Sequence, residues 1–133
     1  MKKVIICTDG AARGNPGPAA IGATIKDEQD RLLASISRCI GSTTNNQAEY
    51  RAIIAALEKA ISLGAREVSL KADSELVVRQ LNGQYRVKNQ ALIPLYQQVK
   101  NLSGSLAGFT IAYIPRARNA EADSLANRAL DAP

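Results

Sequence analysis

Short apolar runs alternate with turn-forming segments along the first part of the chain. The runs cover residues 3–9, 20–26 and 31–40, and each has the length of a strand. A segment rich in glycine and proline separates the first two runs, and the polar turn "DEQD" separates the second from the third. Apolar residues occupy both faces of the first run, which is typical of a central, buried strand. Three strands with short connections predict an antiparallel meander.

The apolar spacing changes to the helical period after this meander. Residues 43–64 fit a helix that begins between Thr44 and Asn46 and ends at Gly64, and Thr44 with Gln47 matches a capping box. The rest of the chain alternates between the two periods. This alternation predicts strands at 67–73 and 108–115 and helices at 74–83, 89–104 and 119–130. Pro94 should disturb the first turns of the helix at 89–104, and Asn119 should cap the helix at 119–130.

This order of elements predicts a single α/β domain over residues 1–133. A strand meander followed by helix–strand alternation implies one five-stranded mixed sheet, which is antiparallel in its first part and parallel in its later part, with helices packed on it. No internal repeat, low-complexity tract or linker indicates a domain boundary.

The composition is typical of a folded, mildly basic protein. Hydrophobic residues make up 46% of the chain and charged residues 22%, and 17 Lys and Arg against 12 Asp and Glu give a net charge of +5. That charge suits a phosphate-rich partner, although many basic proteins bind none. No apolar run approaches the roughly 20 residues of a membrane span, and the N-terminus reads as a strand rather than a signal peptide. We therefore expect no membrane association and a cytoplasmic location.

Two residue types limit the chemistry that the chain can perform. It has no histidine, which excludes histidine general bases, Ser-His triads and histidine-ligated zinc. Its two cysteines, Cys7 and Cys39, have no metal-binding spacing, and we expect both to be buried, reduced thiols.

Four carboxylates stand at positions that need an explanation. Asp9 and Asp73 are expected to end strands, and ligand sites in open α/β sheets lie beyond the carboxyl ends of parallel strands. Either residue alone could instead start a turn or cap a helix. Glu49 shares a helical stripe with Ile53 and Leu57 that should face the sheet, where burial of an unpaired carboxylate costs several kcal/mol. Asp123 falls in the first turn of the last helix, where an acid also suits the helix dipole.

One explanation covers all four carboxylates: they converge at one end of the sheet around divalent cations. Clustered carboxylates repel one another unless cations neutralise them. Magnesium prefers hard oxygen ligands, and two such ions about 4 Å apart can hold the attacking and leaving oxygens of a phosphodiester. This chemistry needs no histidine ligand.

Four sequence blocks resemble those of type 1 ribonuclease H. They occur in that family's order, each with its acid at the family's position, and the match spans about residues 3–130. The blocks are "TDGAARGNPGPAAIG", "TTNNQAEYRAIIAAL", "KADSELVVRQL" and "RNAEADSLANRAL".

The resemblance implies both a fold and an activity. The fold is the ribonuclease H-like one, with helices on both faces of a five-stranded mixed sheet. The activity is endonucleolytic hydrolysis of the RNA strand of an RNA/DNA hybrid, which leaves 5′-phosphate and 3′-hydroxyl ends. The resemblance also implies two bound Mg²⁺ ions, with Mn²⁺ as a substitute. The family's four catalytic acids map onto Asp9, Glu49, Asp73 and Asp123, and these residues with Gly10 are the implied metal-binding positions.

Substrate contacts are implied by the same resemblance. In the family, backbone amides at the positions of Gly10–Ala12 lie beside the RNA 2′-hydroxyls, and the asparagines that match Asn45 and Asn46 contact the minor groove of the hybrid, although helix capping also explains one of them. Thr44 and Asn15 resemble the family's DNA-phosphate-binding pair. The full set of expected substrate-binding residues is Gly10, Ala11, Ala12, Asn15, Thr44, Asn45, Asn46, Lys88, Arg116 and Arg118.

The chain also departs from the family pattern. Many members carry an assisting histidine before the last helix, where this chain has Arg116 and Arg118, and an arginine cannot shuttle protons. A tryptophan-rich basic handle is missing, so the chain resembles the compact branch without the handle and without an N-terminal hybrid-binding domain. Arg86 and Lys88 remain as phosphate contacts, which predicts weaker and more salt-sensitive binding.

We therefore expect a monomeric RNA/DNA-hybrid endonuclease. Two alternatives stay open on the sequence. One is a nuclease of the same fold that acts on double-stranded RNA or on DNA. The other is a non-catalytic nucleic-acid-binding module, which would be expected to have lost at least one of the four acids.

Overall fold

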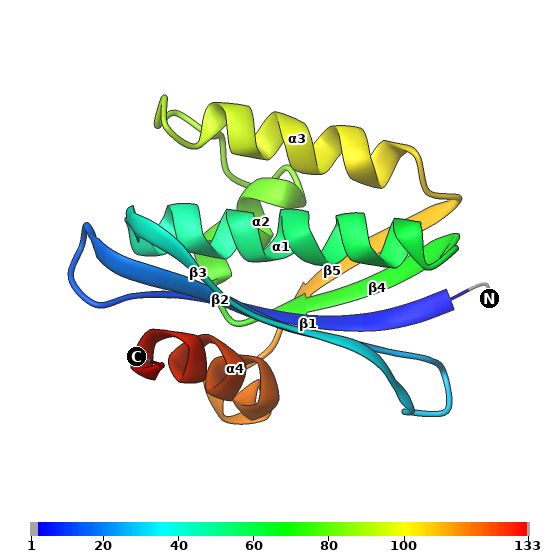
Figure 1. The fold of residues 1–133 in the computed structure, drawn as a ribbon. Coiled ribbons are helices and arrows are strands. Elements are labelled where there is room, and N and C mark those ends of the chain that lie inside the picture. Colours follow the sequence, from blue (N-terminus) through cyan, green and yellow to red (C-terminus); the bar gives the residue numbers. More distant parts are fainter. Residues whose placement is uncertain (1–2, 133) are drawn as a thin grey trace.

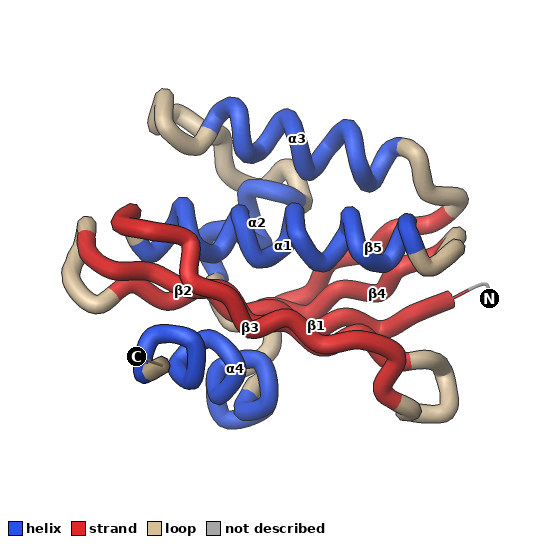
Figure 2. Tube along the Cα trace, in the orientation of Figure 1, coloured by secondary structure: helices blue, strands red, loops and turns tan. Residues whose placement is uncertain are grey.

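Five strands form one mixed sheet in the order β3-β2-β1-β4-β5 in the computed structural model, which describes residues 3–132 (Figures 1 and 2). The elements are β1 (Lys3–Ala12), β2 (Gly17–Lys26), β3 (Leu32–Thr43), α1 (Asn45–Ser62), β4 (Glu67–Ala72), α2 (Glu75–Leu81), α3 (Ile93–Gly104), β5 (Gly108–Tyr113), the short 3₁₀ helix η1 (Arg116–Arg118) and α4 (Ala120–Asp131). Strands β1, β2 and β3 pair antiparallel, and β1, β4 and β5 pair parallel. The predicted mixed sheet is therefore confirmed.

Strand β1 is longer than the apolar pattern predicted. It was expected to end at Asp9, but its ladder with β2 continues to the pair Ala12 and Ala19. Small residues on both strands allow this extension, so the loop is confined to residues 13–16. The parallel ladder with β4 ends earlier, at the pair Thr8 and Ala72. Asp9 is therefore the first residue of β1 beyond its parallel neighbour, not the last residue of the strand.

Helix α1 begins and ends as its capping residues predicted. Thr44 is the N-cap and accepts a hydrogen bond from the Gln47 amide at 3.2 Å, while the Gln47 side chain accepts one from the Thr44 amide at 3.2 Å. Gly64, with a φ of 91°, follows the last turn in the left-handed conformation that ends many helices.

The later helices differ from the sequence prediction in where they begin and how they are capped. Helix α2 begins at Glu75 and is capped by Ser74 rather than Asp73, and the Ser74 side chain accepts from the Val77 amide. Helix α3 begins only at Ile93, so Pro94 lies in its first turn and, contrary to the prediction, does not disturb the helix. Proline is tolerated there because the amides of the first turn have no hydrogen-bond partner within the helix. Asn119 is the N-cap of α4, as predicted, although its side chain makes no capping hydrogen bond.

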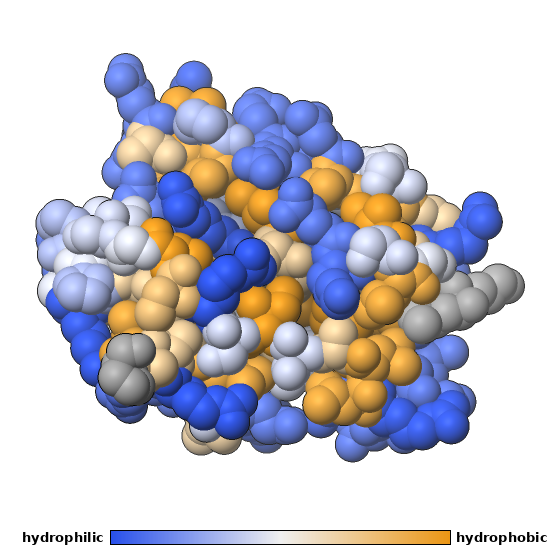
Figure 3. Space-filling view, in the orientation of Figure 1, coloured by the Kyte–Doolittle hydropathy of each residue, from blue (hydrophilic) through white to orange (hydrophobic). Residues whose placement is uncertain are grey.

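The helices cover both faces of the sheet (Figure 1). Helices α1, α2 and α3 lie on one face and α4 on the other. The main core lies between α1 and the sheet and includes Ile6, Ile53, Leu57 and Leu70, all fully buried. On the view of Figure 3, hydrophilic side chains interrupt the hydrophobic patches that reach the surface. In residues 3–132, no helix combines the length and the apolar character that a membrane span requires.

The two cysteines are both free thiols, but they are not both buried as expected. Cys7 on β1 is half-buried, whereas Cys39 is exposed. The reason is that β3 is an edge strand of the sheet, and its neighbour on the free side is solvent.

Two glycines allow helices to approach the sheet closely on opposite faces. A Cβ at Gly10 would overlap the backbone of Ala48 and Glu49 in α1, and a Cβ at Gly22 would overlap the carbonyl oxygen of Ala122 and the amide nitrogen of Ala126 in α4. Backbone atoms cannot move aside as a flexible side chain can. These two positions therefore fix how near α1 and α4 lie to the strands that carry the candidate site.

We predict that Gly22→Ala destabilises the protein by about 2–3 kcal/mol, because the added methyl group displaces α4 from β2. Urea titration monitored by circular dichroism would measure this free energy of unfolding. Gly104→Ala is the matched control, since a Cβ there meets no atom within 4 Å, and it should change stability by less than ~0.5 kcal/mol. Equal stabilities of the two variants would contradict the proposed close approach.

Candidate functional site

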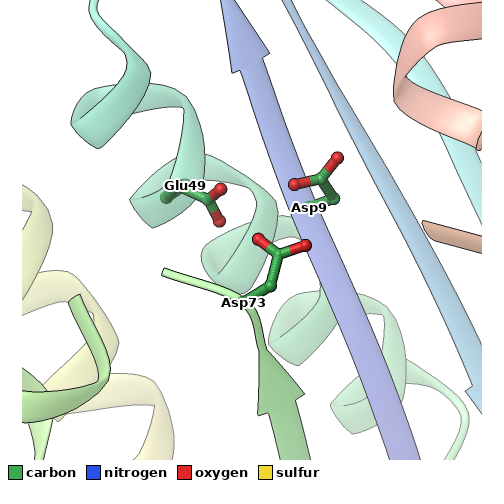
Figure 4. Close-up of side chains that lie close together, drawn as sticks. All are labelled: Asp9, Glu49 and Asp73. Carbon is green, nitrogen blue, oxygen red and sulfur yellow. The ribbon is translucent and has the colours of Figure 1, made fainter. Parts of the chain in front are cut away.

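Asp9, Glu49 and Asp73 meet at the point where β1 passes the end of β4. Their carboxylates come from β1, from α1 and from the residue directly after β4, and they point toward one another (Figure 4). One carboxylate oxygen from each residue lies within 4.8 Å of those of the other two. The arrangement is close enough for the three side chains to share one cation.

The backbone explains how these side chains are brought together. The β1–β4 ladder ends at Thr8 and Ala72, so Asp9 and Asp73 are the next residues along two adjacent parallel strands. Glu49 reaches them from the buried stripe of α1 that also carries Ile53 and Leu57. The missing side chain of Gly10 lets that stripe lie directly against β1.

Burial gives the carboxylates of Asp9 and Glu49 unusual electrostatics. Asp9 is fully buried, and neither of its carboxylate oxygens nor Oε2 of Glu49 has a hydrogen-bond partner within residues 3–132. Burial, and then the charge of Asp73, raise the pKa of Asp9 to about 7. Burial, and then the charges of Asp9 and Asp73, raise the pKa of Glu49 well above its usual value. A hydrogen bond from the Gly10 amide lowers this pKa and so offsets part of the increase.

Within residues 3–132, these three carboxylates form no ion pair with a positive side chain. Over the described residues, no lysine or arginine nitrogen lies within 4.0 Å of the carboxylates of Asp9, Glu49 or Asp73. An isolated buried carboxylate is expensive, and three together are more so. The cluster therefore requires either protons or a bound divalent cation, and its all-oxygen donor set suits a hard divalent ion.

Asp123 lies beside this cluster rather than within it. It is half-buried in the first turn of α4 and is near enough to Asp9 to contribute to the raised pKa of that residue. Its carboxylate lies 3.9 Å from Arg116 and accepts a hydrogen bond from Asn127 at 3.2 Å. The sequence placed four acids at one end of the sheet, and the structure brings three of them into mutual contact distance with the fourth adjacent to Asp9.

A cavity of about 340 Å³ opens onto the carboxylates. Two of the four acids line this cavity. Four other residues that the sequence assigned to metal or substrate binding line it as well. It also contains two residues that the sequence analysis missed, Ser74 and Tyr113. The lining consists of Gly10, Asn45, Asn46, Glu49, Asp73, Ser74, Tyr113 and Arg116.

The two missed residues had signals in the sequence. Ser74 directly follows Asp73, and its role as the cap of α2 makes it face the same end of the sheet. Tyr113 pairs with Ala72 at the end of the β4–β5 ladder, so it lies at the carboxyl end of a parallel strand. Its side chain is exposed and lines the cavity.

Asn15 and Asn45 join the glycine-rich loop to the start of α1. The Asn45 side chain accepts from the Ala12 amide at 2.9 Å, and the Asn15 side chain accepts from the Asn45 amide at 3.1 Å. Neither Asn45 nor Asn46 caps the helix, because Thr44 does so. Ala11 is half-buried in β1 beside Gly10, so the expected contacts at residues 10–12 belong to a strand and not to a loop.

Six of the expected substrate-binding residues do not line the cavity: Ala11, Ala12, Asn15, Thr44, Lys88 and Arg118. Of these, Arg118 is exposed in η1, and Lys88 is exposed in the segment between α2 and α3.

Comparisons with known proteins match this chain over nearly its full length. A family model described as reverse transcriptase-like matches residues 7–129. The bifunctional protein Rv2228c of Mycobacterium tuberculosis is 46% identical over 131 residues, which make up 98% of this chain and 36% of that protein. The chain therefore spans about a third of the length of this curated relative.

Solved structures agree with the sequence match. RNase H1 from the archaeon Halobacterium salinarum superposes with a TM-score of 0.95 at 42% identity, and the match covers 97% of this chain and 98% of that one. LC11-RNase H1, solved in complex with an RNA/DNA hybrid, superposes with a TM-score of 0.92 at 44% identity and 96% coverage of each chain. The family match, the fold and the order of the four sequence blocks agree, and the chain belongs to the reverse transcriptase-like family and, within it, to the type 1 ribonucleases H.

Proposed function

We propose that this chain hydrolyses the RNA strand of RNA/DNA hybrids and leaves 5′-phosphate and 3′-hydroxyl ends. The observation that carries the proposal is the buried group of Asp9, Glu49 and Asp73, which has no positive side chain to neutralise it within residues 3–132. The similar LC11-RNase H1 was solved with an RNA/DNA hybrid, which supports the choice of substrate.

The residues at the site fit a divalent metal, and we assign Mg²⁺ to it, with Mn²⁺ as a substitute. Asp9, Glu49 and Asp73 would hold the metal. The Gly10 backbone and Asp123 would be further ligands, as the resemblance to the type 1 ribonucleases H implies. Two such ions would supply activation of the attacking water and stabilisation of the leaving 3′ oxygen. The buried carboxylate oxygens without hydrogen-bond partners are the atoms available for coordination.

The cavity residues would hold the substrate against the carboxylates. Asn45 and Asn46 at the start of α1, with the backbone of residues 10–12, would contact the minor groove, where the 2′-hydroxyl distinguishes RNA from DNA. Asn15 and Thr44 would bind a phosphate of the DNA strand. Arg116 lines the cavity and, because an arginine cannot shuttle protons, it would bind a phosphate there. Arg118 and Lys88 would contact phosphates farther along the hybrid.

The direct test is Glu49→Gln, which keeps the shape of the side chain and removes its charge. We expect it to lower the rate of hybrid hydrolysis in Mg²⁺ about 100-fold or more, since the site loses a metal-binding oxygen. Labelled RNA/DNA hybrid, double-stranded RNA, DNA duplex and single-stranded RNA would be compared in Mg²⁺ and in EDTA.

Glu58→Gln is the control, because Glu58 lies on the exposed side of the same helix. It should keep the wild-type rate. Cleavage of the DNA duplex but not of the hybrid, or full activity of Glu49→Gln, would refute the proposed function.

The raised pKa of Asp9 also makes the stability of the metal-free protein depend on pH. In the unfolded chain an aspartate loses its proton near pH 4, whereas the folded state retains it until about pH 7. The unfolded state therefore binds fewer protons between these values, and stability falls as pH rises from about 4 to about 7. Above that range the loss is complete and remains constant.

We predict that Asp9→Asn stabilises the protein in EDTA by about 1–3 kcal/mol more at pH 8 than at pH 4, because the variant has no charge to bury. Denaturant titrations at both pH values would measure the difference. Asp30→Asn, at an exposed turn position, should show no such pH dependence. An Asp9→Asn effect that is the same at pH 4 and pH 8 would show that Asp9 is not held in its protonated form.

A further inference from the structure

The side chain of Asn119 is buried at the start of α4 but does not cap that helix. It is 2% exposed. An N-cap asparagine normally accepts a hydrogen bond from the first turn through its oxygen, yet Oδ1 of Asn119 has no partner within residues 3–132. Instead, Nδ2 donates to the Thr8 carbonyl at 2.8 Å and to Oδ2 of Asp73 at 3.1 Å. The side-chain amide thus binds two other segments and makes no hydrogen bond to the first turn of α4.

These two hydrogen bonds join the segments that carry Asp9 and Asp73. Thr8 belongs to the last pair of the β1–β4 ladder, and backbone pairing no longer holds the two strands together beyond it. Asp9 and Asp73 are the first residues past that point. An amide that binds both the Thr8 carbonyl and the Asp73 carboxylate therefore fixes their separation where the ladder cannot.

The backbone of Asn119 places the fourth acid as well. Its carbonyl oxygen accepts from the Asp123 amide at 3.0 Å, which is the first helical hydrogen bond of α4. Through its side chain and its main chain, one residue thus contacts the segments that carry Asp9, Asp73 and Asp123.

The chemistry of the donor matters for a cation site. A neutral amide orients the Asp73 carboxylate without cancelling its charge, and it occupies Oδ2 while leaving the other oxygen available. An arginine or lysine in the same place would form an ion pair and compete with the cation. Hydrogen bonds to ligating carboxylates orient them, and losing such a partner typically weakens metal binding by about 10–100-fold.

We propose that Asn119 is a positioning residue for the metal site, which orients the Asp73 carboxylate and holds the start of α4 against β1 at Thr8, where the ladder with β4 ends. The consequence for hydrolysis rests on the proposed function. The consequence for cation binding does not, because it can be measured without any substrate.

The experiment compares Asn119→Ala and Asn119→Ser with wild type by titrating Mg²⁺ alone and following the midpoint of thermal unfolding. Asn82→Ala is the matched control, since Asn82 Nδ2 donates to the Ile111 carbonyl at 3.1 Å rather than to a carboxylate. We expect the Mg²⁺ concentration for half of the stabilising shift to rise about tenfold in both Asn119 variants and to stay unchanged in Asn82→Ala. With hybrid as substrate, kcat at low Mg²⁺ should fall about tenfold and recover at high Mg²⁺, with KM for the hybrid unchanged.

Serine is a favoured N-cap residue and is too short to span to both Thr8 and Asp73, so Asn119→Ser keeps the test valid if the alanine variant does not fold. A merely structural asparagine predicts lower melting temperatures with an unchanged Mg²⁺ half-saturation, and that result would overturn the proposal. So would a wild-type protein whose unfolding midpoint does not respond to Mg²⁺. Wild-type protein that responds to Mg²⁺ but leaves the hybrid intact would overturn the proposed function alone, because the titration still decides the role of Asn119.

Discussion

Repulsion among buried carboxylates is the constraint on which the rest of this structure depends. Asp9 and Glu49 lie in the protein interior with Asp73 at its margin, and no positive side chain within residues 3–132 reaches them. The fold holds these groups together through backbone pairing and helix packing rather than through their own attraction. Such an arrangement lowers the stability of the metal-free protein and makes the site ready for a cation. Destabilised functional groups supported by the surrounding scaffold are a general feature of active sites.

The scaffold meets this constraint by combining strands of unequal length with close helix packing. Strand β1 continues past the end of β4, which opens space beside Asp9 for the Asp73 carboxylate. Gly10 lets α1 bring Glu49 against β1 on one face, and Gly22 lets α4 approach on the opposite face. The site is thus built where three layers come close together, and each layer contributes an acid.

The sequence predicted this architecture well because its periodicities are clear. The meander, the mixed sheet and the capping box of α1 are all present. The burial of Glu49 followed from its place on the stripe with Ile53 and Leu57.

The errors concern features that depend on long-range pairing. Nothing local shows that β1 continues to Ala12, because that extension requires the pairing of small residues on β2. The side chain of Asn119 looks like a helix cap in sequence, and only the neighbouring strands decide that it binds Thr8 and Asp73 instead. Tyr113 enters the cavity through its register with β4, which the apolar pattern does not contain.

The hydrogen bond between Thr8 and Asn119 spans 111 positions of the chain, and it has a consequence for biosynthesis. A ribosome makes residue 8 long before residue 119, so the two ends of this contact cannot meet until translation of the domain is almost complete. Contacts of such high sequence separation form late and slow folding. Asp9 on β1 and Asp73 after β4 therefore remain without the α4 segment while residues 74–118 are being synthesised. A nascent chain cannot assemble the whole centre before the ribosome has made α4.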